Sequence, residues 1–147
     1  RFTTESFTLS GWFYMDALAD NNAIISSYDG TTGYHFTVTA TGKVCLDTGG
    51  TVDASSCSPS STVLTGAWYN GATVYDSESD ERIIYINGVE VDRESTGGGS
   101  LSPTSNSLNL GIRANLTHDM AGRLDDLRIY NRALSVNEIR AIYNATK

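Results

Sequence analysis

The sequence is poor in proline, cysteine and basic residues, and it has no long apolar run. It contains two prolines, two cysteines and ten lysines and arginines, against 17 aspartates and glutamates, among 147 residues. The net charge of −7 argues against binding to nucleic-acid phosphates, because these require clustered basic side chains. No apolar segment approaches the roughly 20 residues of a membrane-spanning helix, so we expect no membrane insertion. The chain starts without an initiator methionine or a signal-like segment, which suggests a mature or excised piece of a longer protein.

Glycine and tyrosine are abundant instead, with 14 and eight residues. The length suits a single domain, 1–147, that buries about two-thirds of the surface of its unfolded chain. Short segments rich in β-branched and aromatic residues alternate with turn signals. We expect strands near residues 7–15, 23–28, 33–39, 43–47, 62–65, 67–75, 82–86, 89–93, 107–113 and 119–130. This pattern predicts an all-β fold, a two-sheet antiparallel jelly-roll β-sandwich, with exposed loops at 53–61 and 95–106.

The end of the chain combines a strand with one short helix. Alternation in residues 122–130 predicts a strand on which Leu124 and Leu127 face opposite sides. Ser135 and Glu138 then form the pattern of a capping box, in which each side chain accepts the backbone N–H of the other residue. Apolar residues recur at helical spacing after this box, so we expect the sandwich to carry one short C-terminal helix.

Four segments carry a family resemblance. They are FTLSGWF at residues 7–13, GAWYNGATVYD at 66–76, IIYINGVEV at 83–91 and GRLDDLRIYNRALSVNEIRAIY at 122–143. In this order they resemble the laminin-G-like, concanavalin A-like β-sandwich modules. The resemblance implies the jelly-roll fold and leaves the activity open, because one fold hosts many functions. Relatives usually begin with a further strand, which we expect to be missing here or to be supplied by another molecule along an open sheet edge.

The resemblance also implies a structural calcium ion. Related sandwiches bind one through an aspartate on the strand that holds Asp125, with other ligands from the opening strand. Because calcium takes several oxygen ligands, the coordination in this chain is open. The alternative is that Asp125 and Asp126 accept backbone N–H groups or pair with Arg123 and Arg128.

The two cysteines, Cys45 and Cys57, flank a segment that can fold back as a hairpin and bring their sulfurs together. A disulfide there would stabilise the fold by about 2–3 kcal/mol, whereas two reduced, buried thiols are the alternative. Sequons at Asn115 and Asn144 favour N-glycosylation in an oxidising compartment. We therefore expect an extracellular or cell-surface protein.

One acidic motif has a catalytic interpretation. Glu90, Asp92 and Glu94 form the E-x-D-x-E pattern that resembles the signature of retaining β-glucanases. Alternation on a strand would place the three carboxylates on one face, at a spacing conceivable for glycoside hydrolysis. The motif follows a tight turn rather than lying on a central strand, and Arg93 replaces an apolar residue. We interpret it as a solvated strand face and expect neither catalytic residues nor enzyme activity.

Binding of a glycan would require exposed aromatic rings with polar neighbours. The candidate residues are Tyr28, Asp29, Tyr34 and Tyr69, with Trp68 and Tyr14 as further aromatic candidates. Tyr28 and Asp29 lie at an expected loop tip. Trp12, by contrast, is expected to serve core packing rather than sugar stacking.

The sequence thus favours a non-catalytic extracellular module that binds glycans or matrix and cell-surface proteins. The alternative is a structural subunit of an extracellular filament or sheath, which self-associates by edge-strand pairing. A glucanase-like glycoside hydrolase ranks third.

Overall fold

The computed structural model describes residues 5–49, 54–96, 101, 104–113 and 119–147. In this part of the chain the elements are β1 (Phe7–Met15), β2 (Asn22–Ser26), β3 (Gly33–Val38), β4 (Val44–Gly49), β5 (Ala54–Cys57), β6 (Trp68–Asp76), β7 (Glu81–Ile86), β8 (Val89–Ser95), β9 (Asn109–Leu110), β10 (Gly122–Tyr130) and α1 (Val136–Thr146). No helix among these is long and apolar enough to span a membrane.

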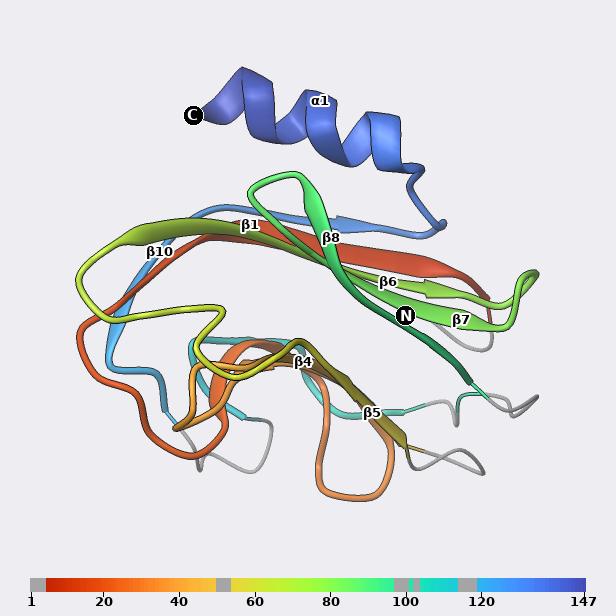
Figure 1. Cartoon of the computed structure of the whole chain (residues 1–147). Coiled ribbons are helices and arrows are strands. Elements are labelled where there is room, and N and C mark those ends of the chain that lie inside the picture. The colour runs from red at the N-terminus through yellow and green to blue at the C-terminus, as the bar shows by residue number, and fades with distance from the viewer. Residues whose placement is uncertain (1–4, 50–53, 97–100, 102–103, 114–118) are drawn as a thin grey trace.

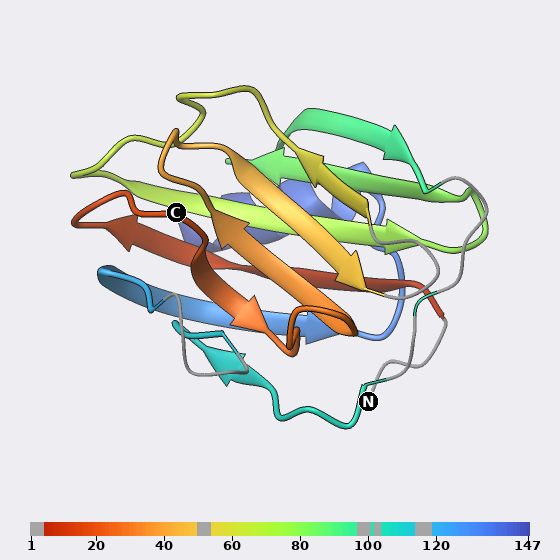
Figure 2. The ribbon, with the colours of Figure 1, turned by 90° about the horizontal axis from the view of Figure 1, so that it is seen from below.

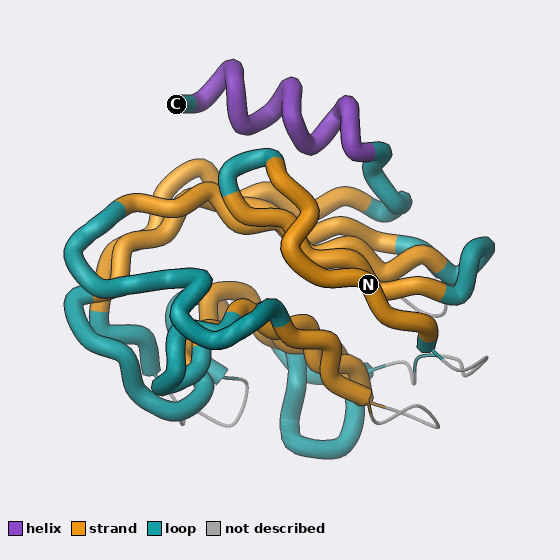
Figure 3. Tube along the Cα trace, in the orientation of Figure 1, coloured by secondary structure: helices purple, strands orange, loops and turns teal. Residues whose placement is uncertain are grey.

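The strands form two antiparallel five-stranded sheets that lie over one another (Figure 1). Sheet A has the order β10-β1-β6-β7-β8, and sheet B has the order β5-β4-β3-β2-β9. Seen from below, the strands of sheet B lie across those of sheet A (Figure 2). The helix covers the face of sheet A that points away from sheet B (Figure 3). The predicted all-β sandwich with one C-terminal helix is confirmed.

The main core lies between the sheets. Phe7, Leu9 and Phe13 of β1 are fully buried, because every second side chain of this central strand points towards sheet B. Phe13 meets Phe36 of β3 edge-on, with 6.1 Å between the ring centroids. Each such large apolar side chain stabilises the fold by about 1.5–3 kcal/mol when it is removed from water.

Strand β10 contains a β-bulge that the alternation pattern did not predict. The pairing with β1 shifts by one residue, so that both Asp126 and Leu127 lie opposite Gly11. Asp126 has a φ of 47°, the left-handed conformation that accommodates the extra residue. Leu124 and Leu127 consequently both pack against the main core, and the prediction that they face opposite sides is wrong.

Helix α1 begins as its sequence predicts. The Ser135 hydroxyl accepts the Glu138 N–H at 3.4 Å, and the Glu138 carboxylate accepts the Ser135 N–H at 2.9 Å. Ile139 is buried in a second, smaller apolar cluster between the helix and the outer face of sheet A. Its buried partners there are Ala72, Val74, Ile83, Tyr85 and Leu134.

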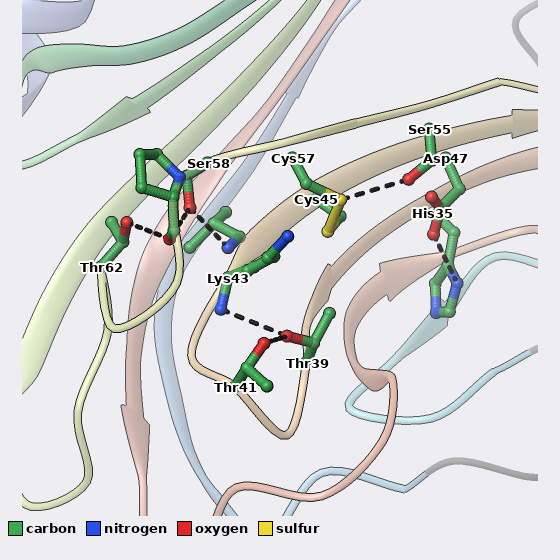
Figure 4. Close-up of a disulfide and its surroundings, with 12 residues drawn as sticks. His35, Thr39, Thr41, Lys43, Cys45, Asp47, Ser55, Cys57, Ser58 and Thr62 are labelled. Carbon is green, nitrogen blue, oxygen red and sulfur yellow. Dashed lines mark hydrogen bonds and ion pairs between the residues drawn. A yellow bond between two sulfur atoms is a disulfide. The ribbon is translucent and has the colours of Figure 1, made fainter.

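The disulfide joins β4 to β5, where Cys45 and Cys57 lie directly opposite one another (Figure 4). This confirms the predicted bond and its hairpin. Two predictions around it are wrong: residues 54–57 form a strand rather than a loop, and 62–65 form no strand. Val63 is fully buried in the core, but its N–H donates to the Gly42 carbonyl in a turn, so its apolar character reflects burial without strand pairing.

Candidate functional site

A cavity of about 470 Å³ opens at one edge of the sandwich, between strand β10 of sheet A and the segments beside β9 and β3 of sheet B. We call it the edge cavity. Its lining residues are Ser27, Tyr34, Thr104, Ser105, Asn106, Leu108 and Ile129. Hydroxyl and amide groups therefore face apolar side chains across a space that is large enough for a small ligand.

The turn that carries Tyr28 and Asp29 lies beside this cavity. Asp29 accepts the backbone N–H groups of Thr31 and Thr32, each at 2.9 Å, so it fixes the turn. The bond from the Thr32 N–H has the largest effect on the pKa of Asp29. Together with the bonds from the Asn106 side chain and the Thr31 N–H, it holds this pKa well below its ordinary value. Asp29 is therefore ionised over the whole physiological range, and its oxygens are engaged within the turn.

Asn106 connects the turn to the cavity. Its side-chain amide bonds to Asp29 and also donates to the Ser27 carbonyl at 3.3 Å. The backbone N–H of Asn106 in turn bonds to the Thr104 hydroxyl at 3.0 Å. A polar group from a distant part of the chain is thus held in place at the mouth of the cavity.

The two tyrosines of this region have different environments. Tyr28 is half-buried, and its ring lies 6.0 Å from that of His35 and 4.9 Å from the Arg113 guanidinium. Tyr34 is 7 % exposed, and its ring packs 5.0 Å from that of Phe7. Burial raises the pKa of Tyr34. Tyr34 therefore contributes a wall of the cavity rather than an exposed platform for stacking.

Tyr69 is not brought together with the other candidates. It lies on β6, where its ring stacks at 6.0 Å on Phe13 of the core and its hydroxyl accepts the Leu64 N–H at 3.2 Å. Of the four predicted glycan-binding residues, Tyr34 thus lines the edge cavity, Tyr28 and Asp29 lie in the adjacent turn, and Tyr69 serves packing elsewhere.

Asp125 lies on the outer face of β10, opposite Trp12 of β1. Its carboxylate accepts the Asp126 N–H at 2.8 Å, while the Asp126 carboxylate holds the Arg128 guanidinium at 2.8 and 3.0 Å. Within the described residues, no three His, Cys, Asp or Glu side chains lie close enough to hold a metal ion. These residues do not supply the several oxygen ligands that calcium takes, and the predicted ion remains a prediction.

The E-x-D-x-E residues do not share a face. A register shift in β8 places Glu90 opposite Tyr85 of the outer cluster and Asp92 opposite Ile84 of the main core. Glu90 is bound by Arg93 through two hydrogen bonds of 2.8 and 2.9 Å, which hold the pKa of Glu90 below its ordinary value. The bulge removes the single carboxylate face that the alternation pattern predicted.

The family model described as the concanavalin A-like lectin/glucanases superfamily matches residues 1–140. The chain belongs to this superfamily. The predicted laminin-G-like, concanavalin A-like relationship is confirmed, and the superfamily, as its description states, includes both lectins and glucanases. No curated protein matches the chain.

Solved structures with a similar fold match the chain along almost its whole length. The CBM40 module of the Ruminococcus gnavus IT-sialidase, bound to α2,3-sialyllactose, has a TM-score of 0.81 at 16% identity, covering 96% of this chain and 84% of that one. A SAP-like pentraxin of Limulus polyphemus has a TM-score of 0.72 at 15% identity, covering 99% and 74%.

A third similar structure is that of a candidate carbohydrate-binding protein from Bacteroides ovatus. It has a TM-score of 0.77 at 21% identity over 93% of this chain, which spans only 40% of the length of that protein. At these low identities, the TM-scores show a shared fold and no more.

The superfamily fold also explains which site residues the sequence did not reveal. Asn106 and Ile129 lie far apart in the sequence and line one cavity only because β10 and the segment before β9 flank the same edge. Of the two sequons, Asn144 is exposed on α1, and Asn115 lies outside the described residues. The disulfide is of a kind that forms in oxidising compartments.

Proposed function

We propose that this chain is a non-catalytic extracellular module that binds a glycan at the edge cavity. The observation that carries the proposal is the convergence of polar groups from Ser27, Thr104 and Asn106 with the apolar side chains of Leu108 and Ile129 around one opening. Sugars present hydroxyl groups and apolar C–H faces together, so a site that binds them needs both kinds of lining. The sugar complexes of similar folds are consistent with this use.

The test begins with a glycan microarray, followed by calorimetry with the glycan that binds best. Replacement Asn106→Ala removes a polar group at the cavity mouth and should weaken binding about tenfold, as a lost buried hydrogen bond does. Because Asn106 also anchors the turn, Leu108→Ala is the second variant; it shortens an apolar side chain that is 47% exposed. Asn137→Ala, on the exposed side of α1, is the matched control.

Retention of full affinity by both cavity variants would contradict the proposed site. Release of free sugar from the bound glycan would contradict the non-catalytic function and favour the glucanase alternative.

Edge pairing remains the second candidate function, because a specific observation favours it. In the described part of the chain β10 pairs only with β1, and Leu108, Leu110 and Ile129 near this edge are exposed. An unpaired edge beside apolar side chains is a template for pairing with another chain. Light scattering separates the two functions: a binding module gives the monomer mass of 15.8 kDa, and a filament subunit gives a mass that rises with concentration.

A further inference from the structure

We propose that a second site, on the outer face of sheet A, binds the neutral pyranose ring of a sugar. The site is a groove of about 470 Å³ between the end of α1 and strands β1, β6 and β10, and we call it the outer groove. Its lining residues are Trp12, Trp68, Asp125, Asp126, Thr146 and Lys147. It shares no lining residue with the edge cavity, so the inference does not depend on the function proposed there.

Strand register builds the groove. Trp12 and Tyr14 of β1 both point outward, and Tyr14 lies opposite Trp68 of β6 while Trp12 lies opposite Asp125 of β10. Aromatic rings and a carboxylate thus form adjacent rows across three strands. Trp68 is the exposed member, with 42% of its surface in contact with water. A flat, half-exposed indole is a surface on which a sugar ring can bury its apolar face.

The aromatic side chains are held in place before any ligand binds. The Trp12 indole N–H donates to the Thr146 hydroxyl at 2.8 Å, and its ring lies 5.8 Å from that of Tyr143 on the helix. The centres of the Tyr14 and Trp68 rings lie 5.7 Å apart. Because these rings are already ordered, a ligand would lose little binding free energy to side-chain ordering. Trp12 packs under the helix on the outer face, not in the main core.

The charges of the groove select the class of ligand. Asp125 is exposed and, within the described residues, makes no ion pair, so its carboxylate is available to accept sugar hydroxyl groups. Asp126 is instead neutralised by Arg128, and the ammonium group of Lys147, the basic residue of the lining, lies 5.5 Å from the centre of the Tyr143 ring on the helix. An acidic sugar would meet the Asp125 charge at close range, whereas a neutral ring gains hydrogen bonds from it. We therefore assign the groove to neutral hexopyranoses.

The chain carries its own reporter for this site, because its two tryptophans both line the groove. Tryptophan fluorescence is titrated with the methyl glycosides of glucose, galactose, mannose and N-acetylglucosamine. We expect a saturable change with one of them at a dissociation constant on the order of millimolar, as for a single stacked ring. Ligand at the edge cavity, which contains no tryptophan, should leave the signal unchanged.

The variants separate this site from the edge cavity. Trp68→Ala should weaken the response about tenfold or more, with Trp12 as the remaining reporter, and Asp125→Asn should weaken it several-fold. Leu64→Ala, at an exposed apolar residue outside the groove, and Asn106→Ala should both titrate like the native chain. If Trp68→Ala loses its fold, the Asp125→Asn titration decides.

Three results would overturn the proposal. They are the absence of a response to every glycoside, a response that survives Trp68→Ala unchanged, and a response to tetramethylammonium chloride but to no sugar. The last result would make the groove a cation site, since tryptophan faces and a carboxylate also attract an alkylammonium ion.

Discussion

A single glycine sets the spacing of the core. Gly71 of β6 lies opposite Gly11 of β1, and a Cβ atom added to Gly71 would lie 2.7 Å from Phe36 and 2.8 Å from Phe13. These atoms belong to rigid rings in the fully buried core, so they can move only by repacking it. The absence of a side chain at this residue is what allows the two rings to meet.

We predict that Gly71→Ala lowers the free energy of unfolding by about 1–3 kcal/mol, because the added methyl overpacks the core. Urea unfolding monitored by tryptophan fluorescence measures the loss. Ser107→Ala, at an exposed residue, is the control and should unfold like the native chain. An unchanged midpoint for Gly71→Ala would show that the rings move aside at no cost.

At the scale of an element, helix α1 owes its start to a local network. Ser135 and Glu138 satisfy each other's backbone N–H groups, and the Arg132 guanidinium binds the Glu138 carboxylate at 2.6 and 3.0 Å. We predict that Ser135→Ala costs about 1 kcal/mol of stability, the usual effect of a lost N-cap. Thermal unfolding followed by circular dichroism checks this, and Ser107→Ala, exposed and outside the helix, serves again as the control.

The same network makes the helix sensitive to acid. The bond from the Arg132 guanidinium has the largest effect on the pKa of Glu138, and the bond from the Ser135 N–H the next largest. Together they lower this pKa from 4.5 to about 2. A carboxyl whose pKa is lower when folded contributes stability above its unfolded pKa, and this contribution is lost as pH falls through the folded pKa. We therefore expect an NMR titration to place the pKa of the Glu138 carboxyl near 2. We also expect the Glu138→Gln variant to lose less stability than the native chain as the pH falls from 4.5 to 2. A midpoint near 4.5 would contradict the network.

At the scale of the whole molecule, strand β10 contributes to both proposed sites. Ile129 lines the edge cavity, whereas Asp125, on the other side of the bulge, lines the outer groove. The two sites share no lining side chain, and independent sites usually give additive free energies within about 0.5 kcal/mol. We predict that the double variant Asn106→Ala, Trp68→Ala loses binding at each site to the same extent as the single variants. Calorimetry for the edge cavity and fluorescence for the outer groove read the two losses separately.

How much of the site the sequence could predict depends on how local each feature is. The loop tip at Tyr28 and Asp29 is predictable because Asp29-Gly30 is a local turn signal in the sequence. Asn106 and Ile129 were not found, because nothing near either residue in the sequence shows that they face one opening. Trp12 is predicted from the sequence to lie in the core. It points outward instead, because the residues beside it on β1 face sheet B.

The sandwich class, the hairpin that carries the two cysteines and the capped helix can all be predicted from the sequence alone. Each follows from short-range chemistry: strand periodicity between turn residues, two cysteines joined by a short segment, and reciprocal hydrogen bonds within one helical turn. The bulges in β8 and β10 depend on tertiary packing, because a bulge forms where paired strands must stay paired while their side chains fit one core. Those bulges separate Glu90 from Asp92 and turn Leu127 inward, so the register between strands, rather than the alternation within one, fixes which side chains can act together.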